Sequence, residues 1–229
     1  MTMKRVVVPE LLDSDGWTQQ EIKDSLRDIQ MINRHFGGVR TMAALLSKVA
    51  EQTQRRSLSW LDLGGAGGDL ASATAKSLAK QGMTVEPVVL DCAVTHLGGS
   101  YPVVCANALN LPFRDNSFDV VGSCLFLHHL EPEQIIQSVN EGLRVARYAV
   151  LINDMQRHPL LLALSYAGAA IFHSHISRHD GPASVRRAYT PEEIKNMLRQ
   201  SSAGRVELEK FFLFRLGVVV WKQTNRDSE

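Results

Sequence analysis

A cluster of glycines between residues 61 and 69 has the composition of a ligand-binding turn. Residues 61–63 (Leu-Asp-Leu) end an apolar run, and residues 64–68 (Gly-Gly-Ala-Gly-Gly) lead into a stretch with helical pattern. Glycines allow backbone angles that residues with a Cβ avoid, and they let a ligand approach the main chain closely. The loop therefore predicts a nucleotide-type site, although a tight strand-to-helix turn without a ligand has the same composition.

An acidic residue follows the next apolar run, residues 84–90. Asp91 stands at its end, about 20 residues beyond the glycine turn, where the ribose-binding acid of dinucleotide sites is found. A carboxylate there can accept hydrogen bonds from both ribose hydroxyls of NAD or of S-adenosylmethionine. A helix cap or a solvated strand end is the alternative interpretation of Asp91.

Two adjacent histidines end the fourth predicted strand. His128 and His129 would lie at the carboxyl edge of the sheet, where open α/β sheets bind their ligands. A neutral histidine can remove the proton of a phenol, whose pKa of about 10 keeps it protonated at pH 7. We expect His128 to be such a base. The alternative is that one or both histidines tie the strand end to the following loop.

Further histidines and acids could in principle bind a metal ion, but their positions argue against a metal site. His173, His175, His179 and Asp180 have no spacing that fixes a site on one helix face, so they predict a pocket lid or a solvated loop. Asp154 follows the fifth predicted strand, but the fourth strand supplies no partner acid. The sequence therefore predicts no metal site.

The elements around these residues predict one α/β domain with a mainly parallel, doubly wound sheet. Strands alternate with helices, which implies right-handed crossovers. The predicted strands are residues 58–63, 84–90, 102–105, 118–125 and 148–153, and the helices are 18–36, 39–52, 69–80, 132–145, 159–172 and one opened by Thr190. Residues 206–214 and 216–221 predict an antiparallel hairpin at the sheet edge.

Composition limits the function classes. The chain has 229 residues, 45% of them hydrophobic, with 25 basic and 24 acidic side chains. This length favours one domain, and the near-zero net charge gives no field that would attract nucleic acid. Three cysteines without paired spacing predict reduced, buried thiols, and the first ten residues do not read as a signal peptide. We therefore expect a cytoplasmic protein without membrane insertion.

Three later motifs resemble a known family. Residues 105–113 (Cys-Ala-Asn-Ala-Leu-Asn-Leu-Pro-Phe), 115–121 (Asp-Asn-Ser-Phe-Asp-Val-Val) and 123–130 (Ser-Cys-Leu-Phe-Leu-His-His-Leu) resemble class I S-adenosylmethionine-dependent methyltransferases. Over residues 58–153 the chain is similar to the small-molecule enzymes related to ubiquinone and menaquinone C-methyltransferases. Residues 33–38, 153–157 and 177–189 resemble polyketide-associated methyltransferases. The resemblance implies a Rossmann-like fold and S-adenosyl-L-methionine as cofactor.

The same resemblance assigns site residues. It implies that the glycine turn holds the methionine part of the cofactor, that Asp91 holds the ribose and that Cys124 lies near the sulfonium. Ala66 replaces a family glycine and Asn107 a family aspartate, and both substitutions are expected to be tolerated. The implied cofactor-binding residues are Asp62, Gly64, Gly65, Ala66, Gly68, Asp91, Cys92, Asn107, Ala108, Leu109 and Cys124.

These observations predict a methyltransferase for a small aromatic or polyketide-derived acceptor, with transfer to a hydroxyl oxygen. Transfer to a ring carbon of a quinone precursor and a non-catalytic cofactor-binding scaffold are the alternatives. No Asn-Pro-Pro-Tyr or Asp-Pro-Pro-Tyr motif follows the fourth strand, which argues against methylation of adenine or glutamine amino groups, and the oligomeric state stays open. The predicted parts are a helical lid (1–57), a cofactor-binding core (58–156), a helical substrate cap (157–204), an edge hairpin (205–223) and a tail (224–229).

Overall fold

The computed structural model describes residues 3–223, and the predicted tail at 224–229 lies outside these residues. Its centre is a seven-stranded sheet with the order β3-β2-β1-β4-β5-β7-β6. The strands are β1 (Ser57–Leu63), β2 (Thr84–Asp91), β3 (Val103–Cys105), β4 (Phe118–Cys124), β5 (Ala146–Met155), β6 (Ala203–Phe211) and β7 (Arg215–Lys222). Strands β1 to β5 pair in parallel, whereas β7 runs antiparallel to both β5 and β6. The predicted doubly wound sheet and its antiparallel edge hairpin are confirmed.

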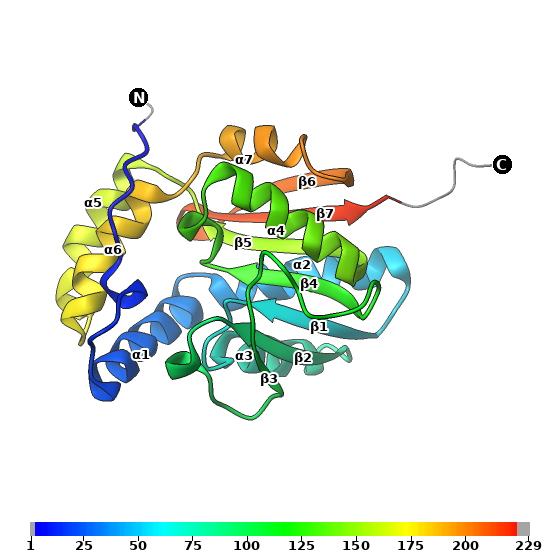
Figure 1. Cartoon of the computed structure of the whole chain (residues 1–229), viewed down its shortest axis with the longest axis horizontal. Helices are drawn as coiled ribbons and strands as arrows, with labels where there is room; N and C mark the ends of the chain where they lie inside the picture. Colours follow the sequence, from blue (N-terminus) through cyan, green and yellow to red (C-terminus); the bar gives the residue numbers. More distant parts are fainter. Residues whose placement is uncertain (1–2, 224–229) are drawn as a thin grey trace.

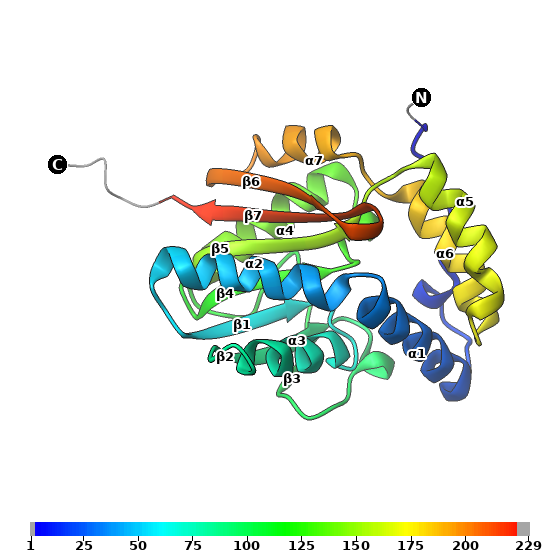
Figure 2. The ribbon, with the colours of Figure 1, turned by 180° about the vertical axis from the view of Figure 1, so that it is seen from behind.

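The helices form two layers on the sheet and one group at its end. Helices α2 and α3 cover one face, α4 and α7 cover the other, and α1, α5 and α6 stand beyond the carboxyl ends of the parallel strands (Figures 1 and 2). Their bounds are α1 (Gln19–His35), α2 (Gly38–Thr53), α3 (Asp69–Ala79), α4 (Pro132–Val145), α5 (Pro159–Ala167), α6 (His175–Arg187) and α7 (Pro191–Leu198). Short 3-10 turns occur at Leu11–Asp13, Val94–His96, Leu127–His129, Gly168–Ile171 and Phe212–Phe214.

Apolar residues on both faces of the strands explain the burial of the sheet. In β4 every residue from Phe118 to Ser123 is buried. Trp60 belongs to the hydrophobic cluster on the α2 and α3 side, and Ile152 belongs to the cluster on the α4 and α7 side. Parallel sheets usually have such continuous apolar strands because helices cover both faces.

One prediction about the cap was wrong. The segment that contains His175, His179 and Asp180 forms helix α6 and not a solvated loop. Gly181 and Pro182 in its sequence argue against a helix, because proline removes a backbone donor and glycine is flexible. Tertiary packing outweighs these preferences, since Ile176 and Val185 are almost fully buried. In the part of the chain that the structure describes, no helix has both the length and the apolar character needed to cross a bilayer.

A buried arginine joins the first helices to the carboxyl edge of the sheet. Arg215, which begins β7, is 3% exposed. It donates to Asn33 Oδ1 on α1 at 3.0 Å, and to Asn153 Oδ1 on β5 at 3.3 Å. It also donates to the carbonyl of Phe36 at 3.3 Å, and Asn153 Nδ2 donates to the carbonyl of Gly38 at 2.8 Å. The start of α2 and the end of α1 are therefore fixed on β5 and β7.

Replacing this arginine should destabilise the protein. In Arg215→Met the two asparagine oxygens lose a charged donor, and hydrogen bonds to charged groups contribute about 1.5 to 3 kcal/mol each. We expect the free energy of unfolding to fall by at least that amount in urea titrations. Arg205→Met is the matched control, because Arg205 on β6 has a 57% exposed side chain, and such a change costs about 0.5 kcal/mol or less. Equal losses in the two variants would contradict a central role for Arg215.

Candidate functional site

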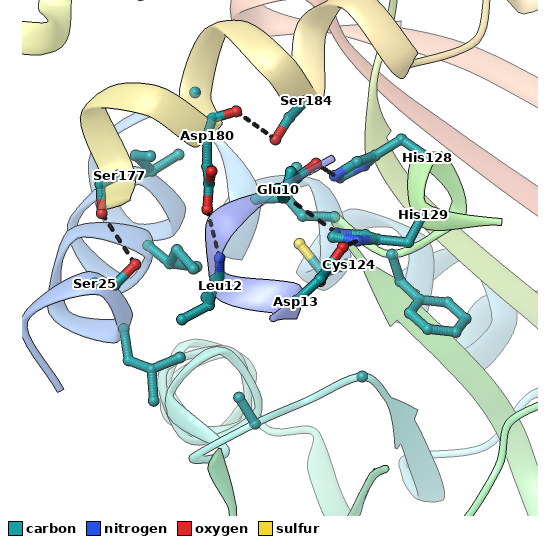
Figure 3. Close-up of a pocket in the computed structure, with 18 of the residues that line it drawn as sticks. Glu10, Leu12, Asp13, Ser25, Cys124, His128, His129, Ser177, Asp180 and Ser184 are labelled. Atoms are coloured by element: carbon teal, nitrogen blue, oxygen red, sulfur yellow. Dashed lines mark hydrogen bonds and ion pairs between the residues drawn. The ribbon is translucent and has the colours of Figure 1, made fainter. Parts of the chain in front are cut away.

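A cavity of about 1010 Å³ opens at the carboxyl edge of the sheet. The ends of β1, β2 and β4 form one side of it, and the 3-10 turn at residues 11–13, α1, α5 and α6 form the other. Figure 3 shows polar side chains from both sides pointing into this space. Helix α2 packs on the sheet with α3. Within the predicted N-terminal lid, the wall of the cavity is therefore formed by α1 and the residues before it.

The glycine turn after β1 leaves its main chain open to the cavity. Gly64 and Gly68 have φ of +65° and +73°, in the left-handed region that favours glycine. A Cβ on Gly65 would lie 2.8 Å from Asp62 Oδ2, so the turn has no room for a side chain there. Ala66 also has a positive φ, +45°, and carries the strain that such angles impose on a residue with a Cβ.

Two acids lie beside this turn, and only one of them forms a hydrogen bond with it. Asp91 lines the cavity, where its Oδ2 accepts a hydrogen bond from the Ala66 amide at 3.1 Å and its Oδ1 accepts from the Ala93 amide at 2.9 Å. Asp62 lies beneath the turn, 1% exposed, and neither of its carboxylate oxygens has a hydrogen-bond partner within the described residues. Burial, together with the charge of Asp91, raises the pKa of Asp62 to about 8.

Residues that follow the next two strands also line the cavity. Cys92, Asn107, Ala108 and Leu109 all line the cavity beyond Asp91. The side chain of Asn107 accepts from the Leu109 amide at 2.8 Å, which fixes the loop after β3. The three cysteines are free, as expected.

The expectation that the cysteines are buried was wrong for two of them. Cys92 and Cys105 are exposed, while Cys124 is half-buried. Cys92 and Cys105 end or follow strands that leave the core at the carboxyl edge, so their apolar neighbours in sequence do not cover them. Cys124 lines the cavity (Figure 3).

The arrangement fits S-adenosylmethionine on structural grounds. The turn has only glycines and one alanine, the Asp91 carboxylate lines the cavity, and the residues beyond it, Cys92 and Asn107 to Leu109, are of small or medium size. Gly65 and Gly68 contribute backbone shape, and Asp62 lies close beneath Gly65. Eight of the eleven predicted cofactor-binding residues line the cavity, and Asp62, Gly65 and Gly68 lie outside its lining.

The predicted base, His128, has a fixed orientation. It is 3% exposed, and its Nδ1 lies 2.9 Å from Asp154 Oδ1 at the end of β5. Arg187 on α6 donates to the carbonyl of His128 at 3.0 Å and to that of His129 at 3.1 Å. The pairing with Asp154 leaves Nε2 of His128 as the ring nitrogen that faces the cavity.

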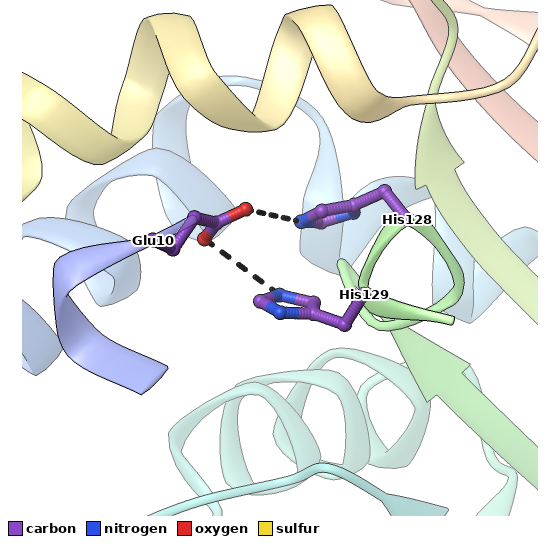
Figure 4. A group of neighbouring side chains, drawn as sticks. All are labelled: Glu10, His128 and His129. Carbon is purple, nitrogen blue, oxygen red and sulfur yellow. Dashed lines mark ion pairs between the residues drawn. The ribbon is translucent and has the colours of Figure 1, made fainter. Parts of the chain in front are cut away.

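Two acids from the N-terminal segment complete this group, and the sequence did not indicate them. Glu10 is 7% exposed and lies between the histidines: Oε1 is 3.5 Å from Nε2 of His128, and Oε2 is 3.8 Å from Nε2 of His129 (Figure 4). Asp13 lies 2.9 Å from Nδ1 of His129. Burial, opposed in part by the charge of His129, raises the pKa of Glu10 to about 7. Neither acid belongs to a local motif, and only the folded chain brings them to the histidines.

The remaining walls of the cavity are mainly apolar. Side chains from α1, α5, the 3-10 turn after α5 and α6 form them: Ile22, Leu26, Ile29, Leu161, Leu164, Ile171, Phe172 and Val185. By contrast, His173 and His179 pair with Asp28 and Asp180 and do not join the polar group around His128. The cavity thus has one end lined by the glycine turn and Asp91, a polar centre and an apolar end.

Comparison with known sequences identifies the central region. Residues 61–149, from within β1 to within β5, match the family model described as a methyltransferase domain. A search of curated proteins finds no match to this chain.

Solved structures share the fold over most of the chain. A protein from Methanococcus maripaludis assigned as an S-adenosylmethionine-dependent methyltransferase has a TM-score of 0.61 at 14% identity and covers 93% of this chain and 98% of its own. The plantazolicin methyltransferase BpumL with S-adenosylhomocysteine has a TM-score of 0.63 at 12% identity, covering 93% of both chains. Human N-acetylserotonin methyltransferase with S-adenosylmethionine has 0.60 at 13% identity, covering 89% of this chain and 57% of its own. At such identities the similarity establishes the fold.

The unpaired carboxyl group of Asp62 should make stability depend on pH. Because its pKa rises from 3.8 in the unfolded chain to about 8 in the folded one, the folded protein binds the extra proton between these values, and stability falls as pH rises through this range. Urea unfolding of the ligand-free protein at pH 5 and pH 8 should show a smaller loss in Asp62→Asn than in the wild type.

Asp119→Asn is the matched control for this measurement. Burial alone would raise the pKa of Asp119, but hydrogen bonds from Ser59 and the nearby Arg147 lower it, so this acid is ionised at both pH values and its removal should leave the pH dependence unchanged. A wild type and an Asp62→Asn variant with the same pH dependence would contradict the raised pKa of Asp62.

Proposed function

We propose that this chain, whose domain and fold are those of class I S-adenosylmethionine-dependent methyltransferases, methylates a hydroxyl oxygen of a small, largely apolar acceptor. The observation that carries the proposal is the buried pair of His128 and Asp154, which directs a histidine nitrogen into a cavity with apolar walls. The cofactor, when bound, supplies an electrophilic methyl group on a sulfonium ion.

The cofactor end of the cavity has a positioning role in this proposal. Asp91 would accept hydrogen bonds from the ribose, and the open main chain at Gly64 and Ala66 would approach the methionine part. Asn107 to Leu109 would border the adenine, and Cys124 would lie near the sulfonium. Methyl transfer is an in-line displacement, so fixing the donor at one end and the acceptor at the other would lower the barrier by aligning them.

His128 would hold and remove the proton of the acceptor hydroxyl. The hydrogen bond between Asp154 and Nδ1 fixes the tautomer in which Nε2 carries a lone pair. This is the arrangement that general-base histidines use, with a carboxylate that orients the ring and stabilises its protonated form. Helices α1, α5 and α6 would exclude water from the acceptor.

The apolar walls of the cavity support a small acceptor, and so do the molecules named for proteins with the same fold. Pockets for small molecules are mainly apolar with a few polar groups, and here the polar groups gather around His128. Among proteins with the same fold, one is named for N-acetylserotonin, and another was solved with desmethyl plantazolicin analogues. A methyltransferase domain of the citrinin polyketide synthase also shares the fold, with a TM-score of 0.50.

Removing the charge of Asp91 should weaken cofactor binding. In Asp91→Asn the ribose hydroxyls lose a charged acceptor, and hydrogen bonds to charged groups contribute about 1.5 to 3 kcal/mol. We expect the dissociation constant of S-adenosylhomocysteine in calorimetry to rise at least about tenfold. Glu86→Gln is the control, because Glu86 lies on the same strand but is exposed on the outside. Unchanged affinity in Asp91→Asn would contradict the proposed ribose site.

Removing the base should slow methyl transfer and leave cofactor binding intact. We would incubate the chain with methyl-labelled S-adenosylmethionine and a panel of phenols, alkylresorcinols and quinol precursors, and place the label by mass spectrometry. For His128→Ala we expect turnover to fall by about 10²- to 10⁴-fold, the usual effect of losing a general base. Asp154→Asn should also slow transfer, because it no longer favours the required tautomer.

His35→Ala is the control for these variants, because His35 is exposed at the end of α1 and does not line the cavity. Label on ring carbon alone, or near-normal turnover of His128→Ala, would overturn the proposal of base-assisted transfer to oxygen.

A further inference from the structure

We propose that Glu10, His128 and His129 form a binding site for a zinc-type divalent metal ion, and that such an ion blocks His128 from acting on the acceptor. The metal site is inferred from the positions of these side chains and does not depend on the proposed function. The blocking effect does rest on the proposed function. The working enzyme is then free of metal at this position, and the ion acts as an inhibitor.

The three side chains converge on one point. One ligand atom from each lies within 4.8 Å of the other two, and Figure 4 shows both rings directed at the carboxylate. The distances of 3.5 and 3.8 Å from the carboxylate oxygens to the ring nitrogens exceed those of good hydrogen bonds. They approach the separation of about 3.3 Å between ligands that each lie about 2.0 to 2.1 Å from a tetrahedral zinc ion.

Both histidines are prepared to coordinate through Nε2. The Nδ1 atom of His128 is 2.9 Å from Asp154, and that of His129 is 2.9 Å from Asp13. Histidines that bind metals almost always have such a carboxylate or carbonyl on the other ring nitrogen, which fixes the tautomer and increases the basicity of the ligand. If His128 served only as a base, His129 would not need a carboxylate on its Nδ1. The second histidine–carboxylate pair therefore favours a metal site.

The local charges favour a divalent cation. When Glu10 is ionised, as it must be to bind a metal ion, Glu10, Asp13 and Asp154 carry three negative charges, and Arg187, which lies 3.5 Å from Glu10 and 3.4 Å from Asp13, carries one positive charge. With neutral histidines the sum is −2, and most of this charge is buried, where unpaired charge is costly. A divalent ion between Glu10 and the histidines would bring the sum to zero.

The type of ligand indicates which ion fits. Two imidazoles and one carboxylate are the protein ligands of several catalytic zinc sites, in which a fourth position stays open. Here the open side faces the cavity, since all three residues line it. A zinc ion bound there uses the Nε2 lone pair of His128, so that nitrogen can no longer accept the acceptor's proton.

Metal binding can be measured without activity. We would titrate the untagged, chelator-treated protein with Co²⁺, whose visible bands report tetrahedral nitrogen and oxygen ligands, and then displace it with Zn²⁺ in competition with a chromogenic chelator. We expect a single ion per chain, loss of the Co²⁺ bands in Glu10→Gln and His129→Ala, and about 10- to 100-fold weaker binding in Asp13→Asn, which removes only a supporting carboxylate. His35→Ala should bind like the wild type.

A second measurement tests the inhibition. Methyl transfer should fall in step with Zn²⁺ occupancy and return when a chelator is added, whereas Asp13→Asn should need more Zn²⁺ for the same loss. Absence of Co²⁺ bands in the wild type, or equal binding in Glu10→Gln, would overturn the metal site. Transfer that rises or stays constant while Zn²⁺ fills the site would overturn the inhibition. If His128→Ala proves active, the proposed base fails, but the Co²⁺ titration still decides the metal site.

Discussion

The burial of Arg215 is the constraint on which the site depends. One guanidinium at the start of β7 donates to oxygens from α1, from the residue that follows α1 and from β5. A buried charge must be surrounded by acceptors. The first two helices therefore cannot shift along the sheet without leaving the Arg215 guanidinium unpaired. This fixes α1 over the carboxyl ends of the strands, and α1 in turn forms the wall that closes the cavity. The polar centre around His128 therefore relies on an interaction outside it.

Much of the fold could be predicted because its signals are local. Capping boxes opened α1 and α7 at Thr18 and Thr190, and the predicted bounds of α4 agree with the structure. Apolar runs located every strand, although β5 begins two residues earlier than expected and β6 covers residues 203–211 instead of 206–214. Helix α6 could not be predicted in the same way. Its glycine and proline are unfavourable in a helix, and the compensating burial of Ile176 and Val185 comes from contacts with distant segments.

The same distinction separates the predicted from the unpredicted site residues. The glycine turn and Asp91 lie at strand ends, the histidine pair lies in the 3-10 turn shortly after β4, and parallel strands bring their carboxyl ends to one edge of the sheet. Glu10 has no such marker, because it precedes the first helix and reaches the histidines only through tertiary folding. Asp154 was noticed as a strand end, but its hydrogen bond with His128 required the register between β4 and β5. For this reason the sequence did not indicate a site made of Glu10 and both histidines.

The contacts of the N-terminal segment also bear on the order of events during synthesis. Residues 5–13 pair with Glu131, Asp180, Arg186 and Arg187, and the Val6 amide donates to the carbonyl of Arg186 at 3.1 Å. These partners leave the ribosome much later than the segment itself. The parallel strands and their helices can fold earlier from neighbouring residues, as domains do while a chain is made. This segment is synthesised before α6 but reaches its final place after it, because the α6 contacts that hold Glu10 beside the histidines can form only once α6 has emerged.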